Sequence, residues 1–436
     1  MRILFIVPYA PNLIRTRPYN LIRYLNEGGH EVTLLTLYSS AEEQQDLTTL
    51  QNAGVRVISE PLSRSRSLLN SAGAFWTPEP LQAAYCWQPA LAHRIDEVLR
   101  PVNGQPPVDV IHVEHLRGAR YALHALTATR QIRPTNESHT VSDKHAIPVV
   151  WDSVDCISHL FQQAKTQSKS RFGRWITRFD LPRTEHYEGW LAWQFDTVLT
   201  TSTVDQEALL QLASAYRTGS PVIEVLPNGV DLDYFKPDPS VIREPATLVL
   251  SGKMSYHANV SMAVHLIDEI MPLVWAKRPD VQVQIVGKDP APQVQALAAH
   301  PQVIVTGTVP DVRLYLQKAT VAVAPITYGA GVQNKILEAM ACATPVVATP
   351  IAARSLSTGP NHEILIGRDA VEFAAAILSL LEDPGWRTRV GDSGRAYVEV
   401  HHRWSRIVES LVKTYDTLIL DSRTRGVKDA TTQIDS

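Results

Sequence analysis

The sequence predicts an α/β protein with two doubly wound domains. Short β-rich runs alternate with longer helical patterns, first over residues 2–202 and again over residues 246–366. Most of these runs lack the strict apolar–polar alternation of a half-exposed strand, which indicates strands buried on both faces, as in parallel sheets covered by helices. Two such sets, separated by a proline-rich stretch, indicate two sheets and therefore two domains.

The expected strands follow one another at regular intervals. Those of the first half are residues 2–8, 31–38, 55–59, 108–113, 147–151 and 196–202. Those of the second half are residues 246–252, 281–287, 302–307, 320–325, 344–349 and 362–366. An amphipathic C-terminal helix is expected over residues 403–420, and the polar residues 421–436 are expected to be disordered.

The boundary between the domains is expected within "DLDYFKPDPSVIREPA" (residues 231–246), which has three prolines and no helical period. We therefore predict a first domain over residues 1–235 and a second over residues 236–402. The polar residues 133–146 are expected to form a surface loop. Two such domains joined by a linker would make a cleft, and ligands of open α/β sheets bind outside the carboxyl ends of the strands.

Composition narrows the class of protein. The chain has 436 residues, of which 44% are hydrophobic and 19% charged, as expected of a globular protein with large cores. A net charge of −3 gives no global field that attracts nucleic acid. Three scattered cysteines argue against a disulfide framework and favour the cytoplasm. No CxxC or HExxH motif occurs, so no metal site is expected.

The N-terminal apolar run "MRILFIVPYAP" is predicted to be the first strand and not a signal peptide. Pro8 interrupts the run early, and charged residues follow without a small-residue cleavage site. No apolar run in the sequence reaches the length that a membrane-spanning helix needs.

A glycine-rich loop precedes an apolar helix in "YGAGVQNKILEAMACATPVVAT" (residues 328–349). Gly329 and Gly331 allow close backbone approach, and the helix start after them offers N–H groups suited to an anion. Lys335 and Glu338 are three residues apart and share a helix face. Either their charges form a plain ion pair, or the Glu338 carboxylate looks into a crevice and accepts hydrogen bonds from two ribose hydroxyls.

A second strand–loop–helix junction contains Gly252 and Lys253, before a helix expected from about Asn259. A glycine beside a cation at a helix N-terminus suits a diphosphate, and an ordinary structural loop fits the pattern equally well. Asn228-Gly229 is a turn signal, which by itself predicts only a turn.

Titratable side chains cluster at strand ends in the first half. They are His112, Glu114, His115, Asp152 and Asp155. Several titratable groups at neighbouring strand ends point to a functional site more strongly than a lone histidine does.

An aromatic and basic segment follows. Residues 157–183 hold six Lys or Arg and one Asp, and residues 171–179 place aromatic and basic side chains on opposite helical faces. Such a helix is typical of peripheral contact with an anionic membrane, and the alternative is packing against its own domain. Glu185 and Glu188 come next on a helix and are expected to be solvated.

These motifs together resemble those of the retaining glycosyltransferases of the GT-B fold, family 4, also called glycosyl transferases group 1. The specific parts are "LPNGVDLDYF" and "NKILEAMACATPVVAT", in the family's order and spacing. "MSYHANVSMAVHLI", "GVQNKILEAMA" and "WDSVD" are also similar to a subgroup associated with bacterial exopolysaccharide synthesis, including the PEP-CTERM-linked sugar transferases. The resemblance implies two Rossmann-like domains facing across a cleft, with the C-terminal helix packed back on the first.

The resemblance implies that the second domain binds a nucleotide-diphosphate sugar and the first binds a glycan or lipid-linked acceptor. The donor-binding residues would be Gly252, Lys253, Gly329, Gly331, Asn334, Lys335 and Glu338. The catalytic candidates are His115, Glu114 and Lys335, and the acceptor-side candidates are Arg17, Asp152 and Asp155. No metal or other cofactor is expected, because cationic side chains and a helix N-terminus can stabilise the leaving diphosphate.

Four positions depart from the family pattern. The first Glu of the family's paired motif falls at Ala330, and its second basic residue falls near Asn259. The strand-end His-x-His motif reads His112-Val113-Glu114, so Glu114 or His115 would take the place of the missing histidine. Ala343 replaces the usual glycine, and a positive φ kept there would cost roughly 1 kcal/mol.

The expected function is therefore transfer of a sugar from a nucleotide-diphosphate donor in bacterial cell-surface polysaccharide synthesis, in the cytoplasm with peripheral contact at the inner face of the membrane. A sugar-nucleotide 2-epimerase, which shares the two-domain fold, is one alternative. A non-catalytic scaffold that only binds sugar nucleotides or a partner protein is another, since Ala330 and Glu114 depart from the pattern. An oxidoreductase is disfavoured because G-x-G-x-x-G is absent.

Overall fold

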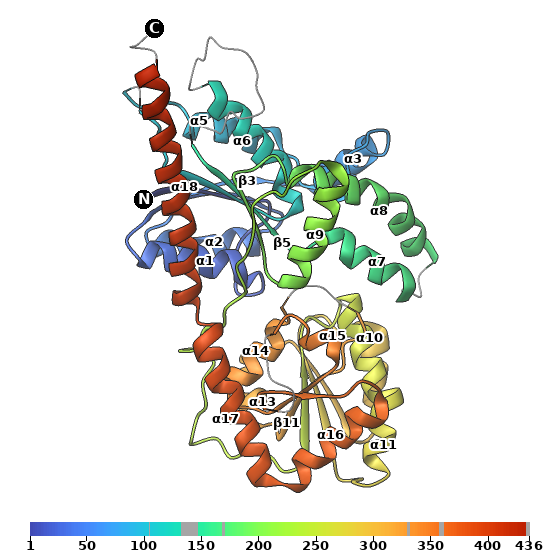
Figure 1. The fold of residues 1–436 in the computed structure, drawn as a ribbon. Helices are drawn as coiled ribbons and strands as arrows, with labels where there is room; N and C mark the ends of the chain where they lie inside the picture. Colours follow the sequence, from blue (N-terminus) through green and yellow to red (C-terminus); the bar gives the residue numbers. More distant parts are fainter. Residues whose placement is uncertain (104, 132–146, 168–170, 329–331, 357–361, 433–436) are drawn as a thin grey trace. The chain divides into compact units, whose positions relative to one another are not determined.

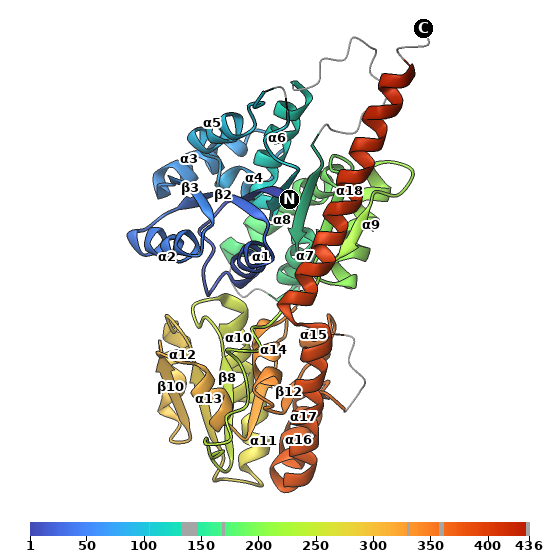
Figure 2. The same cartoon turned by 90° about the vertical axis from the view of Figure 1, so that its left-hand side faces the viewer.

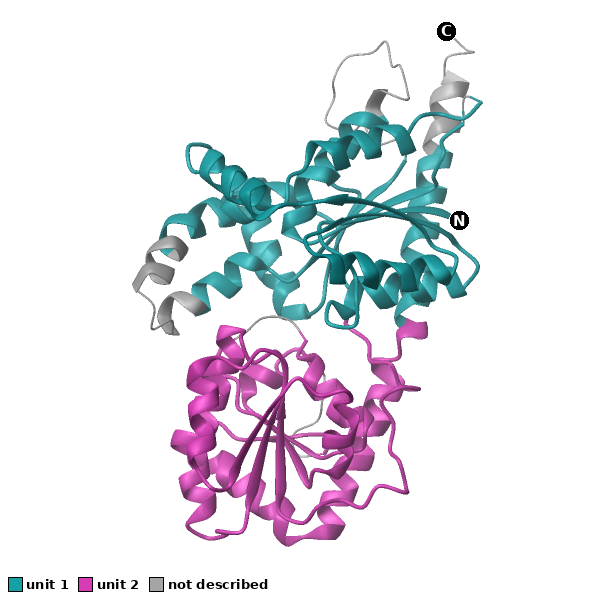
Figure 3. Ribbon diagram, turned by 180° about the vertical axis from the view of Figure 1, so that it is seen from behind, with its two compact units in different colours: residues 1–226, 407–436 teal, residues 227–406 magenta. Residues whose placement is uncertain are grey.

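The computed structural model describes the chain except for residues 104, 132–146, 168–170, 329–331, 357–361 and 433–436. It divides into two compact units, residues 1–226 with 407–436 (unit 1) and residues 227–406 (unit 2), shown in Figures 1 and 3. Each unit is built around its own parallel sheet, so the expected α/β class is confirmed. The surface loop expected at residues 133–146 lies outside the described residues.

Unit 1 has seven parallel strands in the order β3-β2-β1-β4-β5-β6-β7. Their bounds are β1 (Arg2–Val7), β2 (Glu31–Tyr38), β3 (Arg56–Pro61), β4 (Val110–Glu114), β5 (Val149–Val154), β6 (Thr197–Thr200) and β7 (Ile223–Val225). All strands expected in the first half are present. The sequence did not predict β7, because three residues are too few to show a period.

Helices cover both faces of this sheet, with α1 and α2 on one face and α5 and α6 on the other (Figures 1 and 2). The helix bounds are α1 (Thr16–Glu27), α2 (Ala41–Asn52), α3 (Arg64–Ala74), α4 (Leu81–Tyr85), α5 (Pro89–Val98), α6 (Ala119–Gln131), α7 (Ile157–Gln167), α8 (Arg171–Leu191) and α9 (Thr203–Tyr216). A 3-10 turn, Leu116–Gly118, follows β4. This two-sided cover explains why the strands read as apolar runs without alternation.

The chain ends in α18 (Trp404–Thr432), whose residues from Ile407 onward belong to unit 1. Buried side chains recur along it at helical spacing: Ile407, Leu411, Tyr415 and Ile419. The helix continues past residue 420 to Thr432, so residues 421–432 are helical where disorder was expected. Extending an existing helix costs little free energy, because only the first turn carries the nucleation penalty.

Unit 2 has six parallel strands in the order β10-β9-β8-β11-β12-β13 (Figure 2). Their bounds are β8 (Thr247–Ser251), β9 (Gln282–Val286), β10 (Val303–Gly307), β11 (Val321–Ala324), β12 (Val346–Ala348) and β13 (Leu365–Ile366). Each corresponds to a strand expected from the sequence. The carboxyl ends of β8, β9 and β11 therefore lie at one edge of the sheet.

The helices of unit 2 also lie on both faces, with α10 and α11 opposite α13 and α14 (Figure 1). Their bounds are α10 (His257–His265), α11 (Met271–Trp275), α12 (Pro292–Ala296), α13 (Arg313–Lys318), α14 (Asn334–Ala341), α15 (Pro350–Ala353), α16 (Ala370–Glu382) and α17 (Pro384–His401). A short π-helical segment, Leu266–Ile270, joins α10 to α11. Within the described part of the chain, no helix combines the length and apolarity needed to span a bilayer.

The segment that follows β7 is packed into unit 2. The backbone N–H of Val230 donates to the His402 carbonyl over 2.7 Å, and the His402 ring Nδ1 lies 2.7 Å from the Asn228 carbonyl oxygen. Gly229 lies against Trp404, where an added Cβ would meet the indole at 2.5 Å. Unit 2 thus begins at Pro227, whereas the expected boundary was at residue 235. The Asn-Gly turn is a packed junction that only glycine fits.

Candidate functional site

Two glycines let the loops after β8 and β9 cross in contact. Gly252 follows β8 with φ +146°, and Gly287 follows β9 with φ +154°. A Cβ on Gly287 would lie 1.7 Å from the Gly252 carbonyl oxygen, so this crossing excludes any side chain there. A Cβ on Gly252 would meet the Asn259 amide nitrogen at 2.8 Å. The predicted glycine-and-cation loop is therefore a tightly fitted element of unit 2.

Asn259 connects this loop to α14. Its side chain is buried in the first turns of α10. The amide nitrogen donates to the Lys253 carbonyl over 2.9 Å, and the amide oxygen accepts from the Lys335 ammonium over 2.6 Å. The structure thus brings Gly252, Lys253 and Lys335 together, and the residue that departs from the family pattern is the bridge between them. The Lys253 side chain itself is exposed.

Lys335 and Glu338 are both partly exposed, whereas Ile336 and Leu337 between them are buried. Burial lowers the pKa of Lys335 to about 8, although Glu338 opposes that shift. Burial raises the pKa of Glu338 to about 7, although Lys335 opposes that shift too. Neither a hydrogen bond to the Glu338 carboxylate nor an ion pair with Lys335 is found among the described residues. The plain ion pair is therefore not formed, and the carboxylate keeps its accepting capacity.

The two ends of α14 differ in their charged partners. Cations lie at its C-terminus, whereas its first turn has no acidic side chain. At its C-terminus, Arg243 donates to the Ala343 carbonyl over 2.8 Å and Arg395 donates to the Ala341 carbonyl over 2.7 Å. These cations offset the negative end of the helix dipole. At its N-terminus, Asn334 accepts from the Asn228 amide over 3.3 Å, and the helix has no side-chain cap at Gln333. The predicted Gly329 and Gly331 lie outside the described residues.

Ala343, two residues after the end of α14, has a strained backbone conformation. Its φ is +51°, so the condition under which the sequence analysis assigned a cost of roughly 1 kcal/mol is met. Gly391 of α17 lies beneath it, where an added Cβ would be 2.4 Å from the Ala343 carbonyl oxygen. Close packing of α17 fixes the turn and holds the alanine in a conformation that glycine adopts more easily.

In unit 1, Asp152 at the end of β5 is the centre of a buried polar cluster. The Arg17 guanidinium donates to Asp152 through Nε over 2.8 Å, and also donates to the Leu226 carbonyl over 3.0 Å. The His112 ring lies 3.5 Å from the same carboxylate and 2.7 Å from the Tyr415 hydroxyl of α18. Burial alone would raise the pKa of Asp152, but Arg17 and His112 outweigh it and lower that pKa. Arg17, predicted on the acceptor side, is thus enclosed and paired.

Glu114 and His115 are neighbours at the end of β4, and they differ in their hydrogen-bond partners and in the direction of their pKa shifts. Burial, and then Asp152, raise the pKa of Glu114 to about 8. Tyr9 donates to one of its carboxyl oxygens over 3.0 Å, and the other has no partner among the described residues. Burial lowers the pKa of His115 to about 3, and its Nδ1 accepts from the Arg117 N–H over 3.2 Å. Near neutral pH both side chains are therefore mostly uncharged.

Two non-glycine residues at these strand ends have left-handed backbone conformations. His115 has φ +68°, and Val154 has φ +67°. A β-branched residue rarely adopts this region, and such strain concentrates at functional sites. Asp155 follows Val154 and accepts from the Thr201 hydroxyl over 3.1 Å. Burial, and then Asp205, raise the pKa of Asp155 to about 7.

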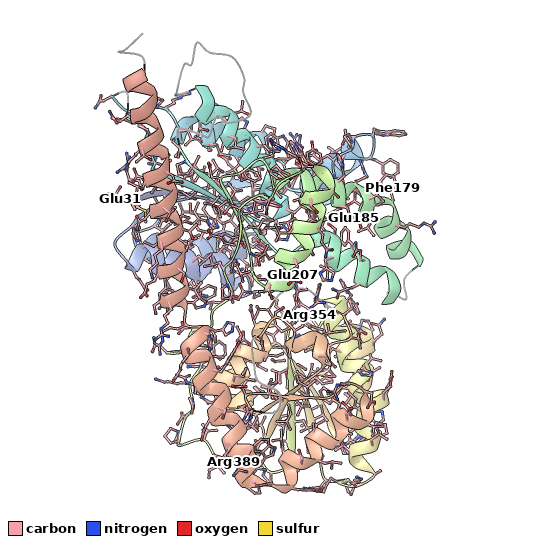
Figure 4. The ribbon with its side chains drawn as sticks, viewed as in Figure 1. Glu31, Phe179, Glu185, Glu207, Arg354 and Arg389 are labelled. Atoms are coloured by element: carbon pink, nitrogen blue, oxygen red, sulfur yellow. The ribbon has the colours of Figure 1, made fainter. Side chains whose placement is uncertain are left out.

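The expectation of solvated carboxylates on α8 is wrong for Glu188. Glu188 is fully buried and accepts from the backbone N–H groups of Ile157 and Ser158, over 2.8 and 2.9 Å, and from the Ser158 hydroxyl. It thereby caps the start of α7, and burial raises its pKa to about 7. Glu185 is partly exposed, accepts from Gln162 over 2.8 Å, and is labelled on α8 in Figure 4.

The sequence did not single out Tyr9, Tyr415 or Asp205 in unit 1. Tyr9 precedes a proline-containing loop and Tyr415 lies in an amphipathic helix, so neither shows a motif. Their roles arise from partners that are 105 and 303 residues away in the chain. Within the described ranges, no group of three or more His, Cys, Asp or Glu side chains is placed to hold a metal ion.

Comparison with known families assigns both halves of the chain. Residues 14–229 match the family described as glycosyl transferase 4-like domain, and residues 245–383 match the family described as glycosyl transferases group 1. Both matched families are glycosyltransferase domain families. The first match covers the strand ends with Asp152 and Glu114, and the second covers Gly252, Lys335 and Glu338.

A relative with a known activity is similar to part of this chain, and two solved structures share its fold. A phosphatidyl-myo-inositol mannosyltransferase of Mycolicibacterium smegmatis is 32% identical over 212 residues, which are 46% of this chain and 53% of the relative. The chain thus matches about half the length of this relative. The fold resembles sucrose-phosphate synthase of Thermosynechococcus elongatus (TM-score 0.63, 18% identity, covering 97% and 100% of the two chains). It also resembles Anabaena HepE in complex with UDP and glucose (TM-score 0.61, 16% identity, covering 96% of this chain and 100% of HepE). The GT-B fold is thereby confirmed.

Proposed function

We propose that this protein is a retaining glycosyltransferase that moves a sugar from a nucleotide-diphosphate sugar to a glycan or lipid-linked acceptor. The proposed setting is bacterial cell-surface polysaccharide synthesis at the cytoplasmic face of the membrane. Both family matches, and relatives such as the mannosyltransferase, support transfer chemistry.

The observation that carries the proposal is the pair Lys335 and Glu338 on α14. Both are partly exposed, and the Glu338 carboxylate has no hydrogen-bond donor among the described residues. A carboxylate in apolar surroundings gains most from a ligand that donates two hydrogen bonds, as a ribose diol does. The Lys335 ammonium and the positive end of α14 suit the diphosphate of the same ligand.

Leaving-group stabilisation is the chemical step that these residues can assist. As the bond between sugar and diphosphate breaks, negative charge grows on the diphosphate, and fixed positive groups next to it lower the barrier. Lys335 is held by Asn259 in one position, so little reorganisation is needed as that charge develops. Lys253 and the α14 N-terminus would add to it. We propose that no metal ion is required, which activity retained in excess EDTA would support.

Unit 1 is proposed to hold the acceptor at the carboxyl ends of β4 and β5. A protonated Glu114 and a neutral His115 can donate or accept hydrogen bonds with hydroxyl groups, without the cost of desolvating a charge. Glu114 or His115 would then do the work of the family's missing histidine. A lipid-linked acceptor is in keeping with the M. smegmatis relative, which is a phosphatidyl-myo-inositol mannosyltransferase.

The experiment that tests the donor is thermal unfolding with UDP-, GDP- and ADP-sugars. A ligand present at about 100 times its Kd adds roughly 2.7 kcal/mol to the free energy of unfolding, so the right donor should raise the Tm clearly. No stabilisation by any nucleotide sugar would contradict the proposal.

Product analysis then separates the remaining functions. An epimerase would convert the stabilising nucleotide sugar without any acceptor, and a binding scaffold would leave it unchanged with every acceptor. A transferase should release nucleoside diphosphate only when a suitable acceptor is present, apart from slow hydrolysis. The order of motifs around Asn228 and Glu338 favours the transferase.

A further inference from the structure

Helix α3 is amphipathic with its apolar side facing outward. Leu68 and Leu69 are each 68% exposed, and Trp76, just after the helix, is 87% exposed. These positions, with Phe75, are spaced i, i+1, i+7 and i+8, so they lie on one side of the helix. Exposed apolar residues are common singly, but a contiguous set on one helix is not.

The side of α3 that faces the protein is polar and hydrogen-bonded. Ser67 is buried, and Asn70 donates to the Trp87 carbonyl over 2.8 Å and to the Tyr85 carbonyl over 3.3 Å. Ser71 donates to the Ser67 carbonyl over 3.0 Å. The two Asn70 hydrogen bonds hold the helix with its leucines outward, so rotating the leucines into the core would break them. The hydrogen bonds of the opposite side therefore determine that the apolar side of α3 faces outward.

The end of α3 is anchored to α8. Phe75 stacks on Phe179 with ring centroids 4.5 Å apart, and Arg183 of α8 donates to the Ala74 carbonyl over 2.5 Å. Figure 4 shows Phe179 at the periphery of the unit, away from the sheet. This contact joins the exposed side of α3 to the aromatic and basic segment of α8. Side chains of residues 171–177 lie outside the described residues, whereas Arg178 is exposed.

The segment that forms this surface carries cations and no carboxylate, and the flanking Glu60 and Glu79 are paired with Arg94 and Arg120. Residues 61–78 contain no Asp or Glu, and Arg64 at the start of α3 is exposed. Arg178 adds a second exposed cation from α8. Leucine, tryptophan and arginine together are the combination that enters the interface of an anionic bilayer, where apolar side chains are buried and cations meet lipid phosphates.

We infer that the α3 surface, formed by Leu68, Leu69, Phe75 and Trp76 with Arg64 and Arg178, docks unit 1 on an anionic lipid bilayer. This surface shares only Arg178 with the sequence-based expectation, which named Arg171–Phe179. The inference rests on the proposed function in one respect, because a lipid-linked acceptor requires the enzyme to reach a membrane. It makes no use of the donor residues of unit 2.

Flotation of the full-length protein with vesicles tests the inference. Vesicles of phosphatidylcholine with phosphatidylglycerol, and of phosphatidylcholine alone, are compared at low and high salt. The wild type should float with the anionic vesicles and less with the neutral ones, and the variant Leu68→Ser, Leu69→Ser, Trp76→Ser should bind about tenfold more weakly or worse. Arg64→Glu with Arg178→Glu should lose the preference for anionic lipid.

A matched control replaces three equally exposed apolar residues from three different elements: Ile242, Val371 and Leu420, which are 86%, 67% and 63% exposed. This control should float like the wild type. Thermal stabilisation by the donor should be the same in all variants, so loss of donor binding and loss of lipid binding are measured separately. Trp76→Ser alone keeps the test decisive if the triple variant does not fold.

Three outcomes would overturn the inference. The wild type could remain unbound to anionic vesicles at low salt. The α3 variant could float as well as the wild type. Alternatively, the wild type could be a dimer in solution that the α3 substitutions convert to a monomer without any effect of lipid, which would show that a second copy of the chain covers this surface.

Discussion

The Glu338 carboxylate lies in surroundings that favour its neutral form in the absence of ligand. Burial raises its pKa to about 7, while the sequence places it between the apolar residues Leu337 and Ala339. Lys335 is one turn away but bonds to Asn259 instead. A structural ion pair would have lowered that pKa below its ordinary value. The residue therefore costs stability in the free protein, and a ligand is the partner that would offset this cost.

Glu338→Gln is expected to weaken donor binding about tenfold or more, because a charge-assisted hydrogen bond contributes roughly 1.5–3 kcal/mol. The Tm without ligand should be unchanged or higher. The raised pKa means that the folded state binds this proton more tightly than the unfolded state, so ionisation destabilises the fold at neutral pH and glutamine removes that effect. Isothermal titration with the nucleotide sugar and unfolding without it check both statements.

Glu382→Gln is the matched control, since Glu382 is an exposed carboxylate of the same unit at the end of α16. It should bind donor normally. If Glu338→Gln bound donor normally and melted at a much lower temperature, the carboxylate would have a structural role.

Donor affinity is expected to be greatest between about pH 7 and pH 8, where Glu338 is ionised and Lys335 is still protonated. As pH falls below about 7, protonation of Glu338 removes the charge that strengthens the ribose contacts. As pH rises above about 8, Lys335 loses the charge that attracts the diphosphate. Kd measured from pH 5.5 to 9.5 in about half-unit steps should rise on both sides. In Glu338→Gln the acid-side rise should disappear and the alkaline-side rise should remain. If Kd still rose below about pH 7 in the variant, a titratable group other than Glu338 would cause that rise.

Sequence reasoning singled out the residues proposed to bind the donor but not the contacts between them. Lys335 and Glu338 could be predicted because a glycine loop and a helix period are local patterns. The bridge through Asn259 could not, because it joins residues 76 positions apart in the chain. The burial of Glu188 was missed for the same reason: its donors lie on α7, one helix earlier.

At the scale of elements, the crossing of the loops after β8 and β9 holds together the part of unit 2 that is proposed to bind the donor. Gly287→Ala should cost about 3 kcal/mol or more, because its Cβ would overlap the Gly252 carbonyl and force the backbone to move. Gly307→Ala is the matched control: Gly307 also has positive φ, at +69°, but an added Cβ there meets nothing within 4 Å. It should cost only about 1 kcal/mol, the penalty of the left-handed conformation.

Urea unfolding of both variants measures these costs, and donor titration shows whether the crossing matters for binding. Gly287→Ala should lose donor affinity even where it stays folded, since Gly252 and Lys253 would shift. Equal stability of the two variants would show that the loop can open to admit a side chain.

Strands and long helices were predictable because their patterns repeat within a few residues. The strand β7 was not, since Ile223–Val225 is too short to show a period, and it forms because β6 offers it an edge. The tail beyond residue 420 was expected to be disordered because it is polar, yet it continues α18. Composition describes whether a segment can fold alone, whereas α18 is nucleated by its buried first half.

At the scale of the whole molecule, the last helix completes the first unit. Helix α18 follows all of unit 2 in the sequence, yet its residues from Ile407 onward belong to unit 1. Its buried side chains are Ile407, Leu411, Tyr415 and Ile419. The Tyr415 hydroxyl lies 2.7 Å from the ring of His112 in β4. The fold of unit 1 therefore depends on residues at both ends of the sequence.

Removing residues 407–436 is expected to unfold unit 1 and leave unit 2 folded. Four buried apolar side chains contribute on the order of 6–12 kcal/mol, at about 1.5–3 kcal/mol each, which equals the whole stability of a typical domain. Unit 2 keeps the contacts of its first residues, because Trp404 and His402, which contact Gly229 and Asn228, remain in the truncated chain. Limited proteolysis with mass spectrometry should show cuts throughout residues 1–226 and a protected fragment from about residue 227 to 406. Truncation of residues 433–436 is the matched control and should change neither pattern. Two protected units in the longer truncation would show that α18 only covers a unit that is already stable.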